Sequence, residues 1–158
     1  MMTSYHYKYH VALSKYKAFP QAKFVYYPLV QVGLSYDNKA IKTPALIDTG
    51  AQYCFFDNSY AKVLKIDYKD TPHQCYLTGI GGQSQENKAY FHDLKLIIYK
   101  PGSIFGLSQK AWEFETKIGF LEKPALYSAI LGEYGFFDYF KFTCCLPESY
   151  FELEYMHD

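Results

Sequence analysis

Short runs rich in β-branched and aromatic residues recur along the chain, and turn-forming residues separate them. Runs of this length with such boundaries predict strands. They occupy residues 24–36, 41–47, 53–56, 73–78, 89–99, 127–132, 142–146 and 149–155. A chain of 158 residues has the length of one domain, and many short strands with few helices are typical of a barrel. We therefore predict a mainly β, closed or partly open barrel.

A hairpin near the start of the predicted domain is the clearest local feature. Asp37 and Asn38 favour a tight turn, so the runs 24–36 and 41–47 are expected to pair as neighbouring strands. Pro28 lacks a backbone N–H. The first strand is therefore expected to start late or to lie on an edge.

Two short stretches favour helices. Asn58 or Ser59 is expected to cap a short helix that ends near Lys65. The apolar spacing within 133–140 suits a second short helix. Residues 104–125 fit either a strand or a helix, so the sequence leaves this segment open.

The first twenty residues differ from the rest of the chain. Tyrosines alternate there with His and Lys, and Pro20 is a plausible boundary. We predict an N-terminal extension over 1–20 and one domain over 21–158. The extension is expected to form a strand face, or an arm that docks on a partner or covers the cleft.

The charge balance excludes some classes of partner. The chain has 16 lysines, no arginine and 16 acidic residues, with a formal net charge of zero. Nucleic-acid binding needs a basic excess, so no nucleic-acid partner is expected. No apolar run approaches the length that spans a bilayer, and the first ten residues lack the apolar core of a secretory signal. We expect no membrane partner and a cytoplasmic location.

Four cysteines are spread along the chain without a metal-binding pattern. They are Cys54, Cys75, Cys144 and Cys145. Reduced thiols, some of them buried, are the expected state. A zinc site that adds His73 or His92 has no recognisable spacing, so neither a metal nor another cofactor is predicted.

The segment ALIDTGA, residues 45–51, carries the strongest chemical signal. Three apolar residues lead into Asp48, so its carboxylate is expected at the edge of a core. Thr49 supplies a hydroxyl, and Gly50 permits a sharp turn with close backbone approach. A fixed, partly desolvated carboxylate suits acid–base chemistry, although an aspartate in an ordinary turn produces the same tripeptide.

Two later segments strengthen the signal. LTGIGG, residues 77–82, lies between strand-like runs, and its glycines suit a hairpin that closes over a substrate. A plain hairpin turn is the alternative. SAILG, residues 128–132, is a short apolar run that ends in glycine.

The order D-T-G-A, glycine-rich hairpin and I-L-G resembles that of the retropepsin-like aspartic proteases, over roughly residues 24–155. The resemblance implies a β-barrel with a flap, and it implies a role for each matching position. Asp48 would be catalytic, in an active-site loop with Thr49, Gly50 and Ala51. The flap tip would consist of Gly79, Ile80, Gly81 and Gly82. The strand that supports the active-site loop would consist of Ala129, Ile130, Leu131 and Gly132.

The resemblance also implies a homodimer, because the chemistry needs two carboxylates and the chain has one D-T-G. Each subunit would contribute one Asp48, and the pair would activate a water for attack on an extended peptide or protein substrate. The implied activity is that of an aspartic endopeptidase without a cofactor. The extension 1–20 and the tail 149–156 are candidates for contacts across the two-fold axis.

Two positions depart from many retroviral members of the family. Those proteins have Asp after D-T-G-A and Arg after the I-L-G segment, where this chain has Gln52 and Glu133. The ion pair that supports their dimer is therefore absent. The alternative interpretation is a non-catalytic module of the same fold, used for dimerisation or peptide binding.

Overall fold

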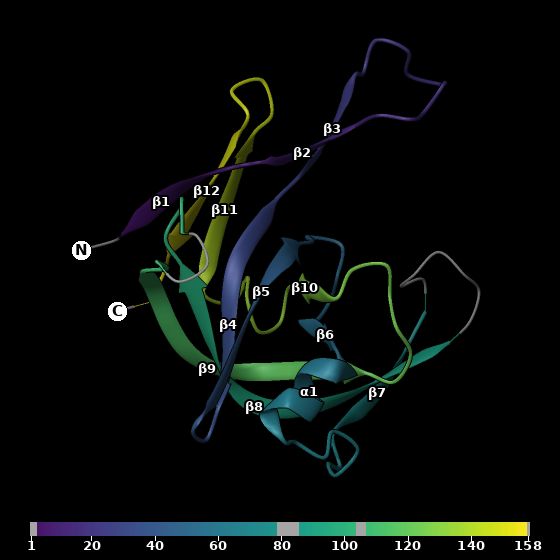
Figure 1. Ribbon diagram of the computed structural model, residues 1–158, viewed down its shortest axis with the longest axis vertical. Coiled ribbons are helices and arrows are strands. Elements are labelled where there is room, and N and C mark those ends of the chain that lie inside the picture. Colours follow the sequence, from purple (N-terminus) through teal and green to yellow (C-terminus); the bar gives the residue numbers. More distant parts are fainter. Residues whose placement is uncertain (1–2, 79–85, 104–106, 158) are drawn as a thin grey trace.

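The computed structural model describes residues 3–78, 86–103 and 107–157. Its centre is a seven-stranded sheet in the order β4-β5-β10-β6-β9-β8-β7, and β4 also pairs with β8. That pairing closes the strands from β4 to β8 into a barrel (Figure 1). The predicted mainly β barrel is therefore confirmed. The strands of this sheet are β4 (Leu29–Tyr36), β5 (Lys39–Ile47), β6 (Phe55–Asp57), β7 (Gln74–Leu77), β8 (Asn87–Tyr99), β9 (Lys110–Leu121) and β10 (Ala129–Leu131).

Two smaller sheets and one helix complete the described structure. The chain ends meet in a three-stranded sheet with the order β1-β12-β11, and β2 pairs with β3 as a separate hairpin. The hairpin projects beyond the barrel (Figure 1). These elements are β1 (Ser4–Lys8), β2 (His10–Leu13), β3 (Phe24–Tyr27), β11 (Phe140–Cys145), β12 (Tyr150–Tyr155) and α1 (Asn58–Leu64).

The segment predicted as an N-terminal extension takes part in both small sheets. β1 pairs antiparallel with β12 of the same chain, so the two terminal segments join one another. Tyr7 and Tyr9 are buried in the main core beside Phe151. The Tyr7 hydroxyl donates a hydrogen bond to the carbonyl of Tyr99 on β8, 2.9 Å away. Division of the chain at residue 20 stays a prediction.

The predicted hairpin and first helix are present, with two adjustments. Pro28 divides the run 24–36 into β3 and β4, as a residue without an N–H does in a ladder. The turn at Asp37 joins β4 to β5, with Asp37 in a left-handed conformation (φ 50°). Helix α1 is capped by Asp57, whose carboxylate accepts the Ser59 amide at 2.9 Å. The cap is therefore one residue earlier than predicted.

The second predicted helix, within 133–140, is wrong: this segment is a series of turns. Gly135 adopts φ +102°, which no helix contains. Its amide donates to the Asp138 carboxylate at 3.0 Å, and its carbonyl accepts the Thr116 hydroxyl at 3.0 Å. Side chains thus take the backbone groups that a helix would pair, and the turn packs against β9.

Candidate active site

Asp48 follows β5 directly, at the point where this strand meets β10. The two strands are parallel, with Ile47 opposite Leu131. The Asp48 amide donates to the Leu131 carbonyl at 3.0 Å. Ile47 is buried and Asp48 is partly buried, so the side chain leaves the core just at its edge. This is the position at the edge of the core that the three apolar residues before Asp48 predicted.

The D-T-G turn fixes the Asp48 carboxylate. Its Oδ1 atom accepts the Gly50 amide at 2.9 Å, and its backbone carbonyl accepts the Ala51 amide at 3.2 Å. A hydrogen bond to an ionised carboxylate stabilises that charge. Thr49, between them, is exposed in the single chain. One oxygen of the carboxylate is thus oriented, while Thr49 is accessible to a partner.

The I-L-G segment lies against this turn through backbone contacts. Ala51 accepts the Glu133 amide at 2.8 Å, and Gln52 accepts the Tyr134 amide at 2.8 Å. A Cβ added to Gly132 would lie 2.4 Å from the Tyr53 carbonyl oxygen and 2.6 Å from that of Ala51. Real Cβ atoms do not approach backbone so closely, so glycine is required at this position.

The fold therefore brings two of the three predicted motifs together. The active-site loop, Asp48 to Ala51, contacts the supporting strand and its glycine, Ala129 to Gly132. The predicted flap residues Gly79, Ile80, Gly81 and Gly82 lie outside the described residues. On either side of them, β7 and β8 pair antiparallel up to Leu77 and Asn87. The roles assigned to all these residues stay predictions.

Tyr27 and Tyr127 form an aromatic pair close to the candidate site, and no sequence pattern distinguishes them among the 18 tyrosines. Tyr27 comes from β3 and Tyr127 from the segment before β10, with ring centroids 6.3 Å apart. Burial is the main reason that the pKa of Tyr127 is raised, and the nearby Tyr27 and the charge of Asp48 raise it further. Tyr127 therefore lies near the Asp48 carboxylate, in its protonated form at neutral pH.

A cavity of about 700 Å³ is lined by residues of β7, β8, β9 and the turns after β10, together with Tyr53. Tyr53, Phe91 and Tyr134 form an aromatic wall, with Tyr53 5.3 Å from Phe91 and 5.8 Å from Tyr134 between ring centroids. Lys117 and Asp93 form an exposed ion pair at 2.8 Å on its rim. Tyr53 is the lining residue that lies nearest in sequence to the active-site loop, and none of the residues Asp48 to Ala51 lines the cavity.

No group of three or more His, Cys, Asp or Glu residues able to hold a metal is found in residues 3–78, 86–103 and 107–157. All four cysteines are free thiols. Burial raises the pKa of Cys54 to about 12, so this thiol stays protonated at neutral pH. Within the described residues, no helix reaches the length and apolarity that a membrane crossing needs.

Comparison with known proteins gives a match at the level of structure. No family model matches the sequence, and no curated protein does so. The fold matches the crystal structure of a retropepsin-like aspartic protease from Rickettsia conorii with a TM-score of 0.51 and 16% identity. The match covers 98% of this chain and 99% of the other. At this identity the likeness establishes the retropepsin-like fold.

Proposed function

We propose that this protein is an aspartic endopeptidase of the retropepsin type. The observation that carries the proposal is the hydrogen-bonded contact between the Asp48 turn and β10, which fixes a carboxylate at the end of a buried strand. It occurs within a fold shared with an aspartic protease. A general acid or base needs this kind of fixed, partly desolvated position.

The active form is proposed to be a homodimer, because one chain supplies one such carboxylate. A two-fold axis that passes beside Asp48 brings the two Asp48 side chains together. Two adjacent carboxylates do not ionise independently, so they share one proton and titrate as a pair. Thr49 is exposed in the single chain, as a residue that contacts its counterpart across the axis must be.

The reaction follows from a dyad with one proton. The ionised carboxylate removes a proton from a bound water, and the water oxygen attacks the peptide carbonyl carbon. The protonated carboxyl donates to the carbonyl oxygen, which gives a neutral tetrahedral intermediate. The C–N bond then breaks as the nitrogen takes the dyad's proton, and one hydroxyl of the intermediate returns a proton to the dyad. The products are a carboxylic acid and an amine, and the dyad again holds one proton. No metal or covalent intermediate takes part.

An extended peptide or protein is the proposed substrate. β7 is the last strand of its sheet, so the β7–β8 hairpin offers an unpaired edge to which an extended chain can add. We propose that the cavity lined by the aromatic residues Tyr53, Phe91 and Tyr134 receives a side chain of such a substrate. We propose that the β7–β8 hairpin and the segment it carries close over the cleft as a flap.

The test is cleavage of a diverse peptide mixture from pH 4 to pH 7, read by mass spectrometry. Asp48→Asn is expected to lower the rate by about 10²–10⁴-fold, because it removes the general base. Asp70→Asn is the control, since Asp70 is an exposed aspartate outside the site. For a dyad formed by dimerisation, the wild-type rate rises faster than linearly with protein concentration in the dilute range.

A second candidate is a non-catalytic module of this fold that dimerises or binds peptides. It is favoured by the absence of the Asp–Arg pair, since Gln52 and Glu133 stand at those positions and are both exposed. This candidate predicts that wild type cleaves no peptide while a folded dimer persists. It also predicts that binding of an extended peptide survives Asp48→Asn. Cleavage that depends on Asp48 would exclude it.

A further inference from the structure

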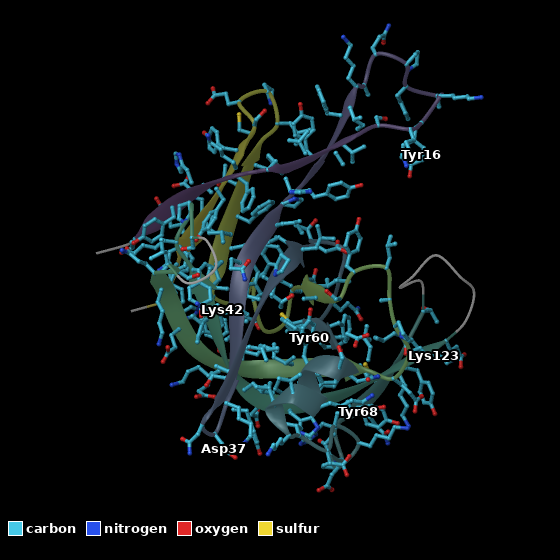
Figure 2. All side chains as sticks on the ribbon, in the orientation of Figure 1. Tyr16, Asp37, Lys42, Tyr60, Tyr68 and Lys123 are labelled. Atoms are coloured by element: carbon cyan, nitrogen blue, oxygen red, sulfur yellow. The ribbon has the colours of Figure 1, made fainter. Side chains whose placement is uncertain are left out.

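The β2–β3 hairpin carries large apolar side chains that are exposed in the described structure. Among the described strands, β2 pairs with β3 alone, and the hairpin projects away from the barrel with Tyr16 near its end (Figure 2). A two-stranded hairpin in water is marginally stable without a third layer. Its exposed large apolar side chains are Val11 (44%), Leu13 (73%), Tyr16 (72%), Phe19 (69%) and Phe24 (47%).

The register of the hairpin collects part of this apolar surface on one face. Leu13 lies opposite Phe24, and Val11 lies opposite Tyr26. Because alternate residues of a strand share a face, these four side chains stand on the same side. Tyr27 belongs to the other face and lies near Tyr127 beside the candidate site. On the face of Leu13 and Phe24, Tyr26 packs against Tyr9 and the main core. The exposed part of this face is therefore its outer part, with Val11, Leu13 and Phe24.

The hairpin leaves the barrel at the end where Asp48 lies. β4 begins beside the end of β5, with Leu29 opposite Leu46, and the Ile47 amide donates to the Pro28 carbonyl at 3.0 Å. The chain before β4 therefore extends past the Asp48 end of the sheet, as Figure 1 shows for β3. A two-fold axis beside Asp48 places any element beyond that end alongside the second subunit.

The charges of the hairpin and the rest of the chain are opposite. Residues 1–36 contain four lysines and no acidic residue, whereas residues 37–158 contain 16 acidic residues against 12 lysines. Lys15, Lys17 and Lys23 are exposed on the hairpin loop. Complementary charges steer association and fix its orientation. The remainder of a second copy of this chain thus carries a net charge opposite to that of the hairpin.

We infer that the β2–β3 hairpin is a dimerisation arm that lies along a second copy of this chain. The surface of that second copy covers the side chains of Val11, Leu13 and Phe24 on the arm. The inference rests on the proposed function in one respect, the meeting of two Asp48 residues at the axis. Because the dimer has two-fold symmetry, the arm of each subunit lies along the other subunit. The arm would stabilise the dimer in place of the Asp–Arg ion pair that many retroviral members of the family have.

The test measures dimerisation in the Asp48→Asn background, where self-cleavage cannot interfere. Analytical ultracentrifugation over a wide range of concentration is expected to show a dimer. Leu13→Glu with Phe24→Glu is expected to weaken it by about tenfold or more, because charges then face a desolvated interface. Val63→Glu is the matched control, since Val63 is an equally exposed apolar residue on α1 (61%).

A charge-reversal variant keeps the test decisive if the double Glu variant does not fold. Lys15→Glu, Lys17→Glu and Lys23→Glu change exposed side chains only, so folding is expected to persist while the dimer weakens, most strongly at low salt. The inference is overturned if the parent is monomeric throughout or if both arm variants dimerise like the parent. It is also overturned if the parent stays monomeric but binds anionic phosphatidylserine vesicles through the arm.

Cleavage assays on the same variants with Asp48 restored separate the two proposals. An arm-dependent dimer that cleaves no peptide supports the arm and contradicts the proposed protease function. Asp48-dependent cleavage that is unchanged in the arm variants supports the function and contradicts the arm.

Discussion

The Asp48 amide donates a hydrogen bond to the carbonyl oxygen of Leu131 across 3.0 Å. Two segments far apart in the sequence thereby become neighbours, and the loop with the candidate catalytic residue rests on a buried strand. Gly132 extends this contact, because its missing side chain lets the Ala51 and Tyr53 carbonyls approach. The position of the Asp48 carboxylate thus depends on backbone packing between the D-T-G turn and the segment that contains Leu131 and Gly132.

Gly132→Ala is expected to destabilise the fold strongly. The added Cβ would lie 2.4 Å and 2.6 Å from backbone oxygens, and backbone cannot move aside as a flexible side chain can. We expect a loss of about 3 kcal/mol in the free energy of unfolding by urea, at the upper end of overpacking costs. Gly102→Ala is the control, since its Cβ would meet nothing within 4 Å and only its φ of +73° opposes the change. Equal losses for both variants would contradict the packing argument.

Thr49→Val is expected to separate dimerisation from folding. Thr49 is exposed in the single chain, so its loss is expected to change the free energy of unfolding of the monomer by less than about 0.5 kcal/mol. We propose that the Thr49 hydroxyl hydrogen-bonds across the axis of the dimer, so the variant is expected to weaken the dimer and to lower peptide cleavage. Ultracentrifugation and cleavage rates measure both, with Thr143→Val, another exposed threonine, as the control. An unchanged dimer would place Thr49 outside the interface.

Tyr7→Phe tests how firmly the first strand is held. The Tyr7 hydroxyl donates to the Tyr99 carbonyl in a buried position, so its removal is expected to cost about 1–2 kcal/mol in urea unfolding. Tyr16→Phe, on a tyrosine that is 72% exposed, is expected to cost nothing measurable. A loss in Tyr7→Phe no larger than in Tyr16→Phe would show that the hydrogen bond to Tyr99 does not stabilise the fold.

The same tyrosine predicts a dependence of stability on alkaline pH. Burial raises the pKa of Tyr7 above its ordinary value near 10. The stabilising contribution of the neutral phenol is therefore complete below about pH 10 and is lost as the pH rises toward the folded-state pKa. Urea unfolding of wild type above pH 10 is expected to show a falling free energy, and Tyr7→Phe a shallower fall. Parallel curves would argue against this assignment.

The cysteines are expected to differ in reactivity. Alkylation requires the thiolate, and burial raises the pKa of Cys54 to about 12. Iodoacetamide at pH 8 is expected to modify the exposed Cys144 while Cys54 stays unmodified until the protein is unfolded in urea. Peptide mapping by mass spectrometry gives the extent at each site. Rapid modification of native Cys54 would show that the region behind the Gly135 turn opens readily.

The strands of the fold were largely predictable from the sequence. In a strand with one buried face, apolar and polar residues alternate, and this alternation is visible in the sequence. β9 shows where this signal is insufficient. Trp112, Phe114, Ile118 and Phe120 alternate with charged or small residues, yet the aromatic spacing also fits a helix when the segment is considered alone. Its place between β6 and β8 decides in favour of a strand. The turn after β10 was assigned as a helix because its apolar spacing does not reveal the Thr116 and Asp138 contacts that replace helical hydrogen bonds.

The sequence alone determined the class of fold, the candidate carboxylate and the segment that supports it, since these depend on local patterns and on residue types with narrow chemical roles. Only the tertiary structure decided that Asp48 rests on Leu131, that Tyr27 and Tyr127 come together, and that an apolar hairpin projects past the Asp48 end of the sheet. These relationships join residues distant in sequence. They are set by barrel closure and by the register of the strands, and no local pattern encodes either.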